Sequence, residues 1–248
     1  MKIGVFDSGA GGLSVVKSLV DHKLFDEIIY YGDTARVPYG TKDKNTIIRY
    51  SLEALEFFNN FDIDLLITAC NTVSAYALGD MREVSNYDIV GVIEPGIRAV
   101  ENKLYDRDAN ILVIGTRATI SSQRYQRELE QRGYHDIVAL QTGLFVPLVE
   151  EGIFGGSILD ASMEYYFKDI SQPTAIILGC THFPLISKSI QNYFSTTPIM
   201  IHSGEAIVEY LEENYDIVSQ DKETTLKIFA SSNVEGLRNI AKEWLVNR

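Results

Sequence analysis

The chain contains very little cysteine, and this excludes several kinds of protein. Its 248 residues include only two cysteines, Cys70 and Cys180. Two are too few for a disulfide scaffold, and they do not form the C-x-x-C of a thioredoxin-like redox pair. In a reducing cytosol both would remain free thiols. They are therefore candidates for chemistry.

Long apolar runs are missing as well. No stretch approaches the roughly 20 apolar residues of a transmembrane helix, so we expect no membrane span and no membrane partner. The N-terminus, Met1 to Phe6, passes directly into a strand-like run and lacks a cleavable signal pattern. These features predict a cytoplasmic protein.

Positive charge is in deficit. Lys and Arg number 22 against 34 Asp and Glu, which gives a net charge of −12. The basic residues are scattered and form no stripe of the kind that binds phosphate backbones, so we expect no nucleic acid partner. An anionic small ligand would have to be held locally, by backbone amides at helix N-termini and by side-chain hydroxyls or amides.

Nucleotide-binding signatures are absent too. The segment Asp7-Ser8-Gly9-Ala10-Gly11-Gly12 follows the first strand-like run, but it lacks the G-x-G-x-x-G spacing, and no P-loop sequence occurs. One interpretation is a turn that needs glycine for its backbone angles. The interpretation we prefer is a helix N-terminus that binds a carboxylate, with Asp7 and Ser8 facing a cleft.

What the chain does have is a repeated order of strands and helices. Short apolar runs predict strands at residues 3–6, 28–31, 65–69 and 89–93, and again at 111–114, 137–140, 175–179 and 199–201. Apolar residues at helical spacing lie between them. A final strand is expected at 226–229, with a helix on either side. Continuously apolar strands that alternate with helices predict parallel sheets covered on both faces.

This pattern predicts an α/β fold of two pseudo-symmetric, doubly wound domains. We expect residues 1–92 with 206–248 to form the N-terminal domain, and residues 93–205 to form the C-terminal domain. Cys70 and Cys180 each follow the third strand of their own half. Ligands bind at the carboxyl edge of such sheets, so two units placed back to back would direct both thiols into one cleft.

Taken singly, each thiol would more often be an inert core group. Their matching positions, beside Asn71-Thr72 and Thr181-His182, favour a catalytic pair instead. A helix N-terminus after each thiol is expected to lower its pKa from about 8.5. Inverting a stereocentre without a cofactor needs a base on one face of the carbon and an acid on the other, and a thiolate opposite a thiol can supply both.

Other interpretations of the pair remain open. Two thiolates and an imidazole match one catalytic zinc ligand set, although Cys180 and His182 are only two residues apart and no carboxylate-rich cluster accompanies them. The chain could also be a two-lobed amino-acid-binding module whose thiols are structural.

Five segments closely resemble glutamate racemases. They are Phe6-Asp7-Ser8-Gly9-Ala10-Gly11-Gly12-Leu13-Ser14-Val15, Pro38-Tyr39-Gly40, Ala69-Cys70-Asn71-Thr72-Val73-Ser74-Ala75, Gly91-Val92-Ile93-Glu94-Pro95-Gly96 and Leu178-Gly179-Cys180-Thr181-His182-Phe183-Pro184-Leu185. The resemblance implies a cofactor-independent enzyme without a metal that interconverts L- and D-glutamate, supplies D-glutamate for peptidoglycan, and is usually a homodimer. Aspartate or a hydantoin is the alternative substrate, since related enzymes share paired cysteines.

The resemblance also implies roles for individual residues. Cys70 would be the base that serves D-glutamate and Cys180 the base that serves L-glutamate, with Asp7, Glu150 and His182 as assisting groups. The implied substrate contacts are Asp7, Ser8, Tyr39, Gly40, Asn71, Thr72, Thr116, Thr119, Thr181 and His182.

Overall fold

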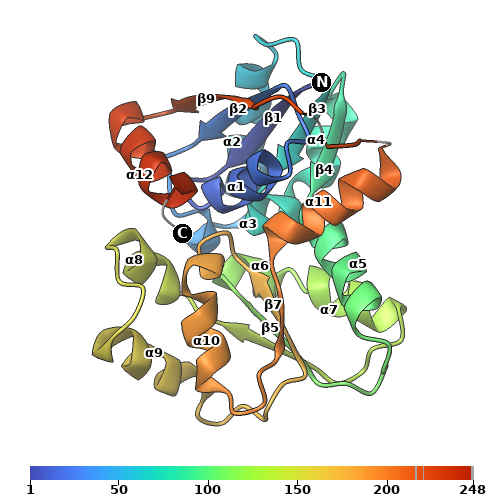
Figure 1. The fold of residues 1–248 in the computed structure, drawn as a ribbon, viewed down its shortest axis with the longest axis vertical. Helices are drawn as coiled ribbons and strands as arrows, with labels where there is room; N and C mark the ends of the chain where they lie inside the picture. The colour runs from blue at the N-terminus through green and yellow to red at the C-terminus, as the bar shows by residue number, and fades with distance from the viewer. Residues whose placement is uncertain (216, 220, 247–248) are drawn as a thin grey trace.

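Two parallel sheets form the two lobes of the molecule in the computed structural model, which describes residues 1–215, 217–219 and 221–246 (Figure 1). One sheet has the order β4-β3-β1-β2-β9. Its strands are β1 (Lys2–Asp7), β2 (Glu27–Gly32), β3 (Leu65–Thr68), β4 (Asp88–Gly91) and β9 (Thr225–Ala230). The other has the order β6-β5-β7-β8, with β5 (Ile111–Gly115), β6 (Ile137–Gln141), β7 (Ala175–Gly179) and β8 (Ile199–Ile201). The predicted fold class is confirmed.

The two sheets are wound in the same way. Counted within its own half, each sheet runs second strand, first strand, third strand, fourth strand, and β9 adds to the outer side of β2. In this winding the crevice lies between the first and third strands, where the strand order reverses. Register places Phe6 beside Thr68 and Gly115 beside Gly179, so the loops after the first and third strands begin at the same level in each sheet.

Helices cover both faces of the sheets. In the N-terminal lobe they are α1 (Leu13–Asp21), the 3-10 turn η1 (Tyr39–Thr41), α2 (Lys44–Phe58), α3 (Asn71–Tyr76), α4 (Leu78–Val84) and α12 (Val234–Val246). In the C-terminal lobe they are α6 (Arg117–Ser121), α7 (Arg124–Gln131), α8 (Phe145–Glu150), α9 (Ser157–Phe167), the 3-10 turn η2 (Phe183–Ile186) and α10 (Ser187–Tyr193). None of the helices in the described part of the chain has both the length and the apolar composition of a membrane span.

The chain passes between the lobes along two helices, α5 (Ile93–Lys103) and α11 (Ser203–Asn214). They pack against each other, and α11 also packs on α1 (Figure 1). We propose the domain division predicted from the sequence, with boundaries after residues 92 and 205, because both boundaries lie at the start of these linking helices.

One predicted detail was incomplete and one was wrong. Apolar spacing predicts Ile48, Leu52 and Leu55 on one face of the second helix. In α2, Leu55 is buried and Ile48 and Leu52 are half-buried against the same core, but the buried stripe also includes Ile47 and Ser51. The Ser51 hydroxyl donates a hydrogen bond to the carbonyl of Ile47 at 2.8 Å, which satisfies a polar group inside the core. The expected strand at 89–93 was wrong in its end, since β4 ends at Gly91 and α5 begins at Ile93. Pro95 is tolerated in the first turn of α5, because the backbone nitrogens there have no partner within the helix.

Candidate active site

A cavity of about 360 Å³ lies at the carboxyl ends of both sheets. Its walls come from the loops that follow β1, β2, β3, β5, β6 and β7, together with η1 and α8. All of the site residues predicted from the sequence, except two, line this cavity. The lining includes Ser8, Tyr39, Gly40, Cys70, Asn71, Thr72, Thr116, Glu150, Cys180, Thr181 and His182. Asp7 and Thr119 lie directly behind this wall.

Cys70 lies at the end of β3 and is the N-cap residue of α3. The thiol is buried, and its Sγ donates to Ser8 Oγ at 3.5 Å. Burial raises the pKa of Cys70 to about 12, and the negative charge of Asp7 adds to this effect, while the Ser8 hydrogen bond opposes it. The expectation that the helix N-terminus lowers this pKa was therefore wrong, because loss of hydration outweighs the short helix.

Cys180 occupies the matching position after β7, and its surroundings differ. Its Sγ lies 3.7 Å from Nδ1 of His182, whose Nε2 lies 3.2 Å from Oε1 of Glu150, although outside hydrogen-bond geometry. Burial alone would lower the pKa of His182. The nearby Cys180, Glu150 and Asp7 outweigh that effect and raise it to about 10, so the imidazole is cationic at neutral pH.

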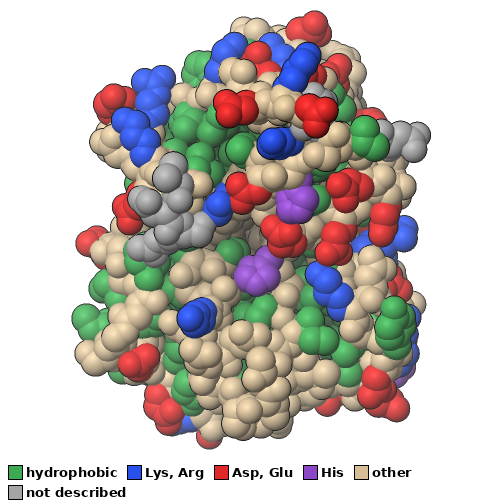
Figure 2. All heavy atoms as spheres, viewed as in Figure 1, with side chains coloured by type: hydrophobic (Ala, Val, Ile, Leu, Met, Phe, Trp, Pro, Cys, Tyr) green, Lys and Arg blue, Asp and Glu red, His purple; other side chains and the backbone are tan. Residues whose placement is uncertain are grey.

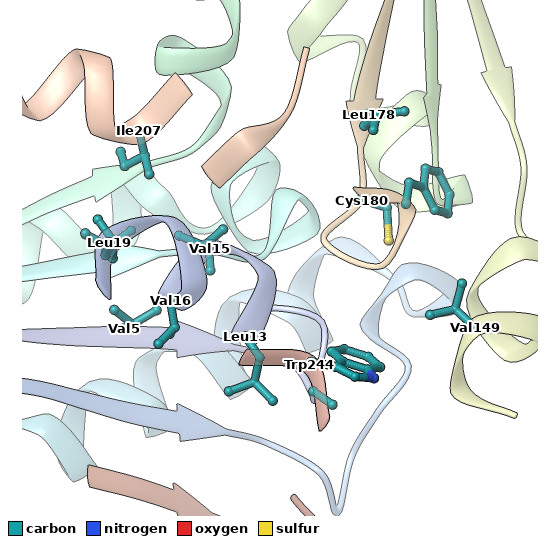
Figure 3. Close-up of a cluster of buried hydrophobic side chains, with 14 of the residues drawn as sticks. Val5, Leu13, Val15, Val16, Leu19, Val149, Leu178, Cys180, Ile207 and Trp244 are labelled. Atoms are coloured by element: carbon teal, nitrogen blue, oxygen red, sulfur yellow. The ribbon is translucent and has the colours of Figure 1, made fainter. Parts of the chain in front are cut away.

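The close-up in Figure 3 shows Cys180 on the loop beyond Leu178, with its sulfur pointing toward the side where Trp244 and Val149 lie. Trp244, from α12, is buried and meets the His182 ring edge-on at a centroid distance of 6.4 Å. The spacing of Leu237, Ile240 and Trp244 along the last helix predicts that Trp244 is a core residue, and its burial confirms this.

Asp7 is fully buried at the end of β1. It accepts hydrogen bonds from the Gly9 amide at 2.9 Å and from Thr181 Oγ1 at 3.3 Å. Burial raises the pKa of this carboxyl, and the charge of His182 opposes the rise. We expected Asp7 to face the cleft, but it faces Thr181 in the other lobe, because that hydroxyl and the loop amides satisfy its oxygens there.

Three threonine hydroxyls form one cluster across the two lobes. Thr72 Oγ1 lies 3.1 Å from Thr116 Oγ1 and 3.2 Å from Thr119 Oγ1, and the last two are 3.0 Å apart. Asn71 is held in a similar way, since its Oδ1 accepts a hydrogen bond from Tyr125 Oη at 2.6 Å. These contacts fix the polar side of the cavity, where a carboxylate could be bound without a net positive field.

Two glycines allow the lobes to approach closely. A Cβ at Gly11 would lie 2.3 Å from Thr181 Oγ1, and a Cβ at Gly40 would lie 2.5 Å from Thr116 Cβ. The positive backbone angles that favour glycine occur at none of Gly9, Gly11 and Gly12. The glycine-rich segment therefore serves close packing, and the interpretation based on backbone angles was wrong.

Sequence reasoning missed some of the cavity wall. The residues that it did not identify are Val37, Pro38, Thr41, Arg117, Gly143, Val146, Pro147 and Gly179. Four of these eight, Pro38, Thr41, Arg117 and Gly179, are direct neighbours of predicted residues, so adjacency was the available signal for them. Gly143 follows β6, and the rule that loops at the carboxyl edge bind ligands could have pointed to it.

Among the residues that the structure describes, no group of three or more His, Cys, Asp or Glu side chains could hold a metal ion.

Comparison with known proteins identifies the family. The family model for Asp/Glu/Hydantoin racemase matches residues 11–211. The chain belongs to this racemase family. The family supports the predicted class of enzyme, an isomerase that acts as an amino-acid racemase, and the family match spans both lobes of this racemase.

Relatives of this racemase cover its full length. The glutamate racemase of a Nitratiruptor species is 59% identical over 245 residues, which cover 99% of this chain and 96% of the relative. The crystal structure of glutamate racemase from Campylobacter jejuni subsp. jejuni superposes with a TM-score of 0.98 at 57% identity, covering 100% of both chains. That from Francisella tularensis subsp. tularensis, in complex with D-glutamate, gives 0.84 at 30% identity, covering 98% of this chain and 93% of the other.

Proposed function

We propose that this racemase interconverts L- and D-glutamate by moving the Cα proton between two thiols, without a cofactor or metal. One observation carries the proposal. Cys70 and Cys180 occupy equivalent strand ends of two sheets with the same winding, and both line a single cavity. The arrangement suits a reaction that must approach one carbon from two sides.

The proton balance of the reaction is simple. In the L-to-D direction, the Cys180 thiolate takes the Cα proton and becomes a thiol, and the Cys70 thiol gives its proton to the opposite face of the carbanion. The raised pKa of Cys70 keeps it protonated for that step. In the D-to-L direction Cys70 must first ionise, and the ammonium group of a bound amino acid would favour its thiolate.

The assisting groups fit these two roles. Cationic His182 lies beside Cys180, so its positive charge faces the sulfur that exchanges the Cα proton. Glu150 lies against His182 and Asp7 lies close enough to influence it, so both acids act through the imidazole. The threonine cluster and Asn71 are placed to receive the substrate carboxylate, whose charge must be stabilised while the carbanion exists.

Incubation in D₂O tests the reaction directly. L-glutamate, with no cofactor and with a chelator present, should give D-glutamate that carries deuterium at Cα, as measured by chiral chromatography and mass spectrometry. The absence of both inversion and deuterium exchange would refute the proposal. Ligand binding without exchange would favour an amino-acid-binding module. Loss of activity in the presence of the chelator would favour the interpretation of the two thiols and His182 as zinc ligands. Aspartate and hydantoins in parallel reactions decide the substrate.

Substituting each thiol tests the two-base assignment. Cys70→Ser and Cys180→Ser should each lower racemisation by at least about 10²-fold, because a serine hydroxyl is a far weaker acid and base at neutral pH. Each variant serves as the structural control for the other, and their unfolding in urea should match that of the wild type. Near-normal turnover in either variant would exclude the assignment.

We further propose that the enzyme is cytoplasmic, supplies D-glutamate for peptidoglycan, and works as a homodimer. The free thiols at Cys70 and Cys180 support a reducing compartment. The family resemblance supports the other two points. Light scattering tests the oligomeric state, and the D-glutamate requirement of cells that lack the gene tests the role.

A further inference from the structure

One cation on the cavity wall has no role in the reaction described above. Arg117 is the first residue of α6 and lines the cavity next to Thr116. Among the described residues that line the cavity, it is the single Lys or Arg. Its side chain is exposed at the cavity mouth, and no ion pair involves it within the described part of the chain.

The guanidinium is held in place from the opposite lobe. Its Nη2 donates a hydrogen bond to the backbone carbonyl of Thr41 at 2.5 Å, and Thr41 also lines the cavity. Arginine has five N–H donors in a rigid planar arrangement, so this single bond fixes the group and leaves most donors available. A neighbouring contact, Gly40 against Thr116, holds the two lobes together at the same point.

The other charged groups of the cavity are already paired. His182 is the second cation, and Glu150 and Cys180 surround it. An acidic amino acid carries two carboxylates, and the threonine cluster with Asn71 is proposed above to receive the one next to Cα, which leaves the side-chain carboxylate to be bound. The second carboxylate must also enter a protein of net charge −12, whose overall field opposes anions. On the face shown in Figure 2, acidic and basic side chains are interspersed.

We propose that Arg117 is a specificity residue that binds the side-chain carboxylate of the acidic amino acid at the mouth of the cavity. This inference rests on the proposed function and names the group that selects an acidic substrate. Guanidinium and carboxylate can form paired, charge-assisted hydrogen bonds, and a lysine at the same position would supply the charge without the paired geometry.

Steady-state kinetics of Arg117→Gln and Arg117→Lys test this role. Arg117→Gln should raise KM for both L- and D-glutamate roughly tenfold and leave kcat within about twofold, since the lost contact is distant from the reacting carbon. Arg117→Lys should recover part of the loss. The KM of the wild type should rise with ionic strength, and that of Arg117→Gln should respond much less.

Arg124→Gln is the matched control, because Arg124 is also an exposed arginine of the C-terminal lobe, pairs with Glu128, and does not line the cavity. A KM increase in Arg124→Gln equal to that in Arg117→Gln would overturn the inference, as would unchanged KM or a fall in kcat alone in Arg117→Gln. Calorimetric binding of glutarate, a dicarboxylate without the amine, separates the two proposals. If glutarate affinity depends on Arg117 but glutamate is not racemised, the inference stands and the proposed function fails.

Discussion

Replacing Gly11 by alanine should lower turnover in both directions. Gly11 lies in the loop after β1, and its missing Cβ leaves room for the loop after β7 in the other lobe. An added Cβ would lie 2.3 Å from Thr181 Oγ1 and 2.6 Å from His182 Nδ1. The substitution therefore acts on the two residues that follow Cys180, without touching either thiol.

The size of the effect follows from these distances. Ordinary van der Waals contact of a Cβ begins at 3.4 Å. The loop after β7, which carries Thr181, must therefore move by roughly 1 Å, or the loop after β1 must move away by a similar amount. A misplacement of about 1 Å at a catalytic group can cost on the order of 10²-fold in rate, or about 2.7 kcal/mol in the barrier. Overpacking should also cost about 1–3 kcal/mol of folding stability.

The assay compares kcat for L- and D-glutamate with the free energy of unfolding in urea. Gly79→Ala is the matched control. Gly79 lies in α4, and an added Cβ there would have no atom within 4 Å. That variant should keep full activity and gain up to about 1 kcal/mol in stability. If Gly11→Ala is folded and turns over at the wild-type rate, the reasoning about the close approach is refuted.

Two further predictions concern buried polar groups. The folded-state pKa of His182, about 10, exceeds its ordinary value of 6.5, so its stabilising effect is complete below pH 6.5 and is lost as pH rises through 10. The free energy of unfolding of the wild type, measured in urea, should fall over this pH window by on the order of a few kcal/mol. The free energy of unfolding of His182→Asn should change much less with pH, and an equal pH dependence in the two proteins would contradict the assignment. Tyr125→Phe removes the 2.6 Å hydrogen bond to buried Asn71 and should destabilise the fold by about 1–3 kcal/mol, whereas a loss under about 0.5 kcal/mol would show that water replaces the hydroxyl.

The strands were predictable because each is a continuous apolar run between turn residues. The matching positions of Cys70 and Cys180 came from the same information, since a thiol that follows a buried strand must lie at the sheet edge. Helix faces were less certain. Ser51 belongs to the buried stripe of α2, but its hydroxyl is satisfied by the carbonyl of Ile47, and a hydrophobicity pattern does not show such local pairing.

The site was predictable as a set of residues but not in its electrostatics. The sequence placed Cys70 before a helix, yet the degree of burial that raises its pKa depends on packing from the whole lobe. Asp7 turns toward Thr181, a residue 174 positions away in the chain, and no local pattern encodes that contact. Arg117 was missed because the contact that holds its side chain at the cavity mouth comes from Thr41, a residue distant in the chain.

The unequal surroundings of the two thiols have a consequence for kinetics. L- and D-glutamate have the same free energy in water, so their equilibrium constant is one and kcat/KM must be equal in the two directions. Cys70 has Ser8 as its hydrogen-bond partner and Cys180 has His182, so the thiols are not equivalent as acids or bases. The difference can appear only as compensating changes in kcat and KM. The enantiomer with the higher kcat must also have the proportionally higher KM.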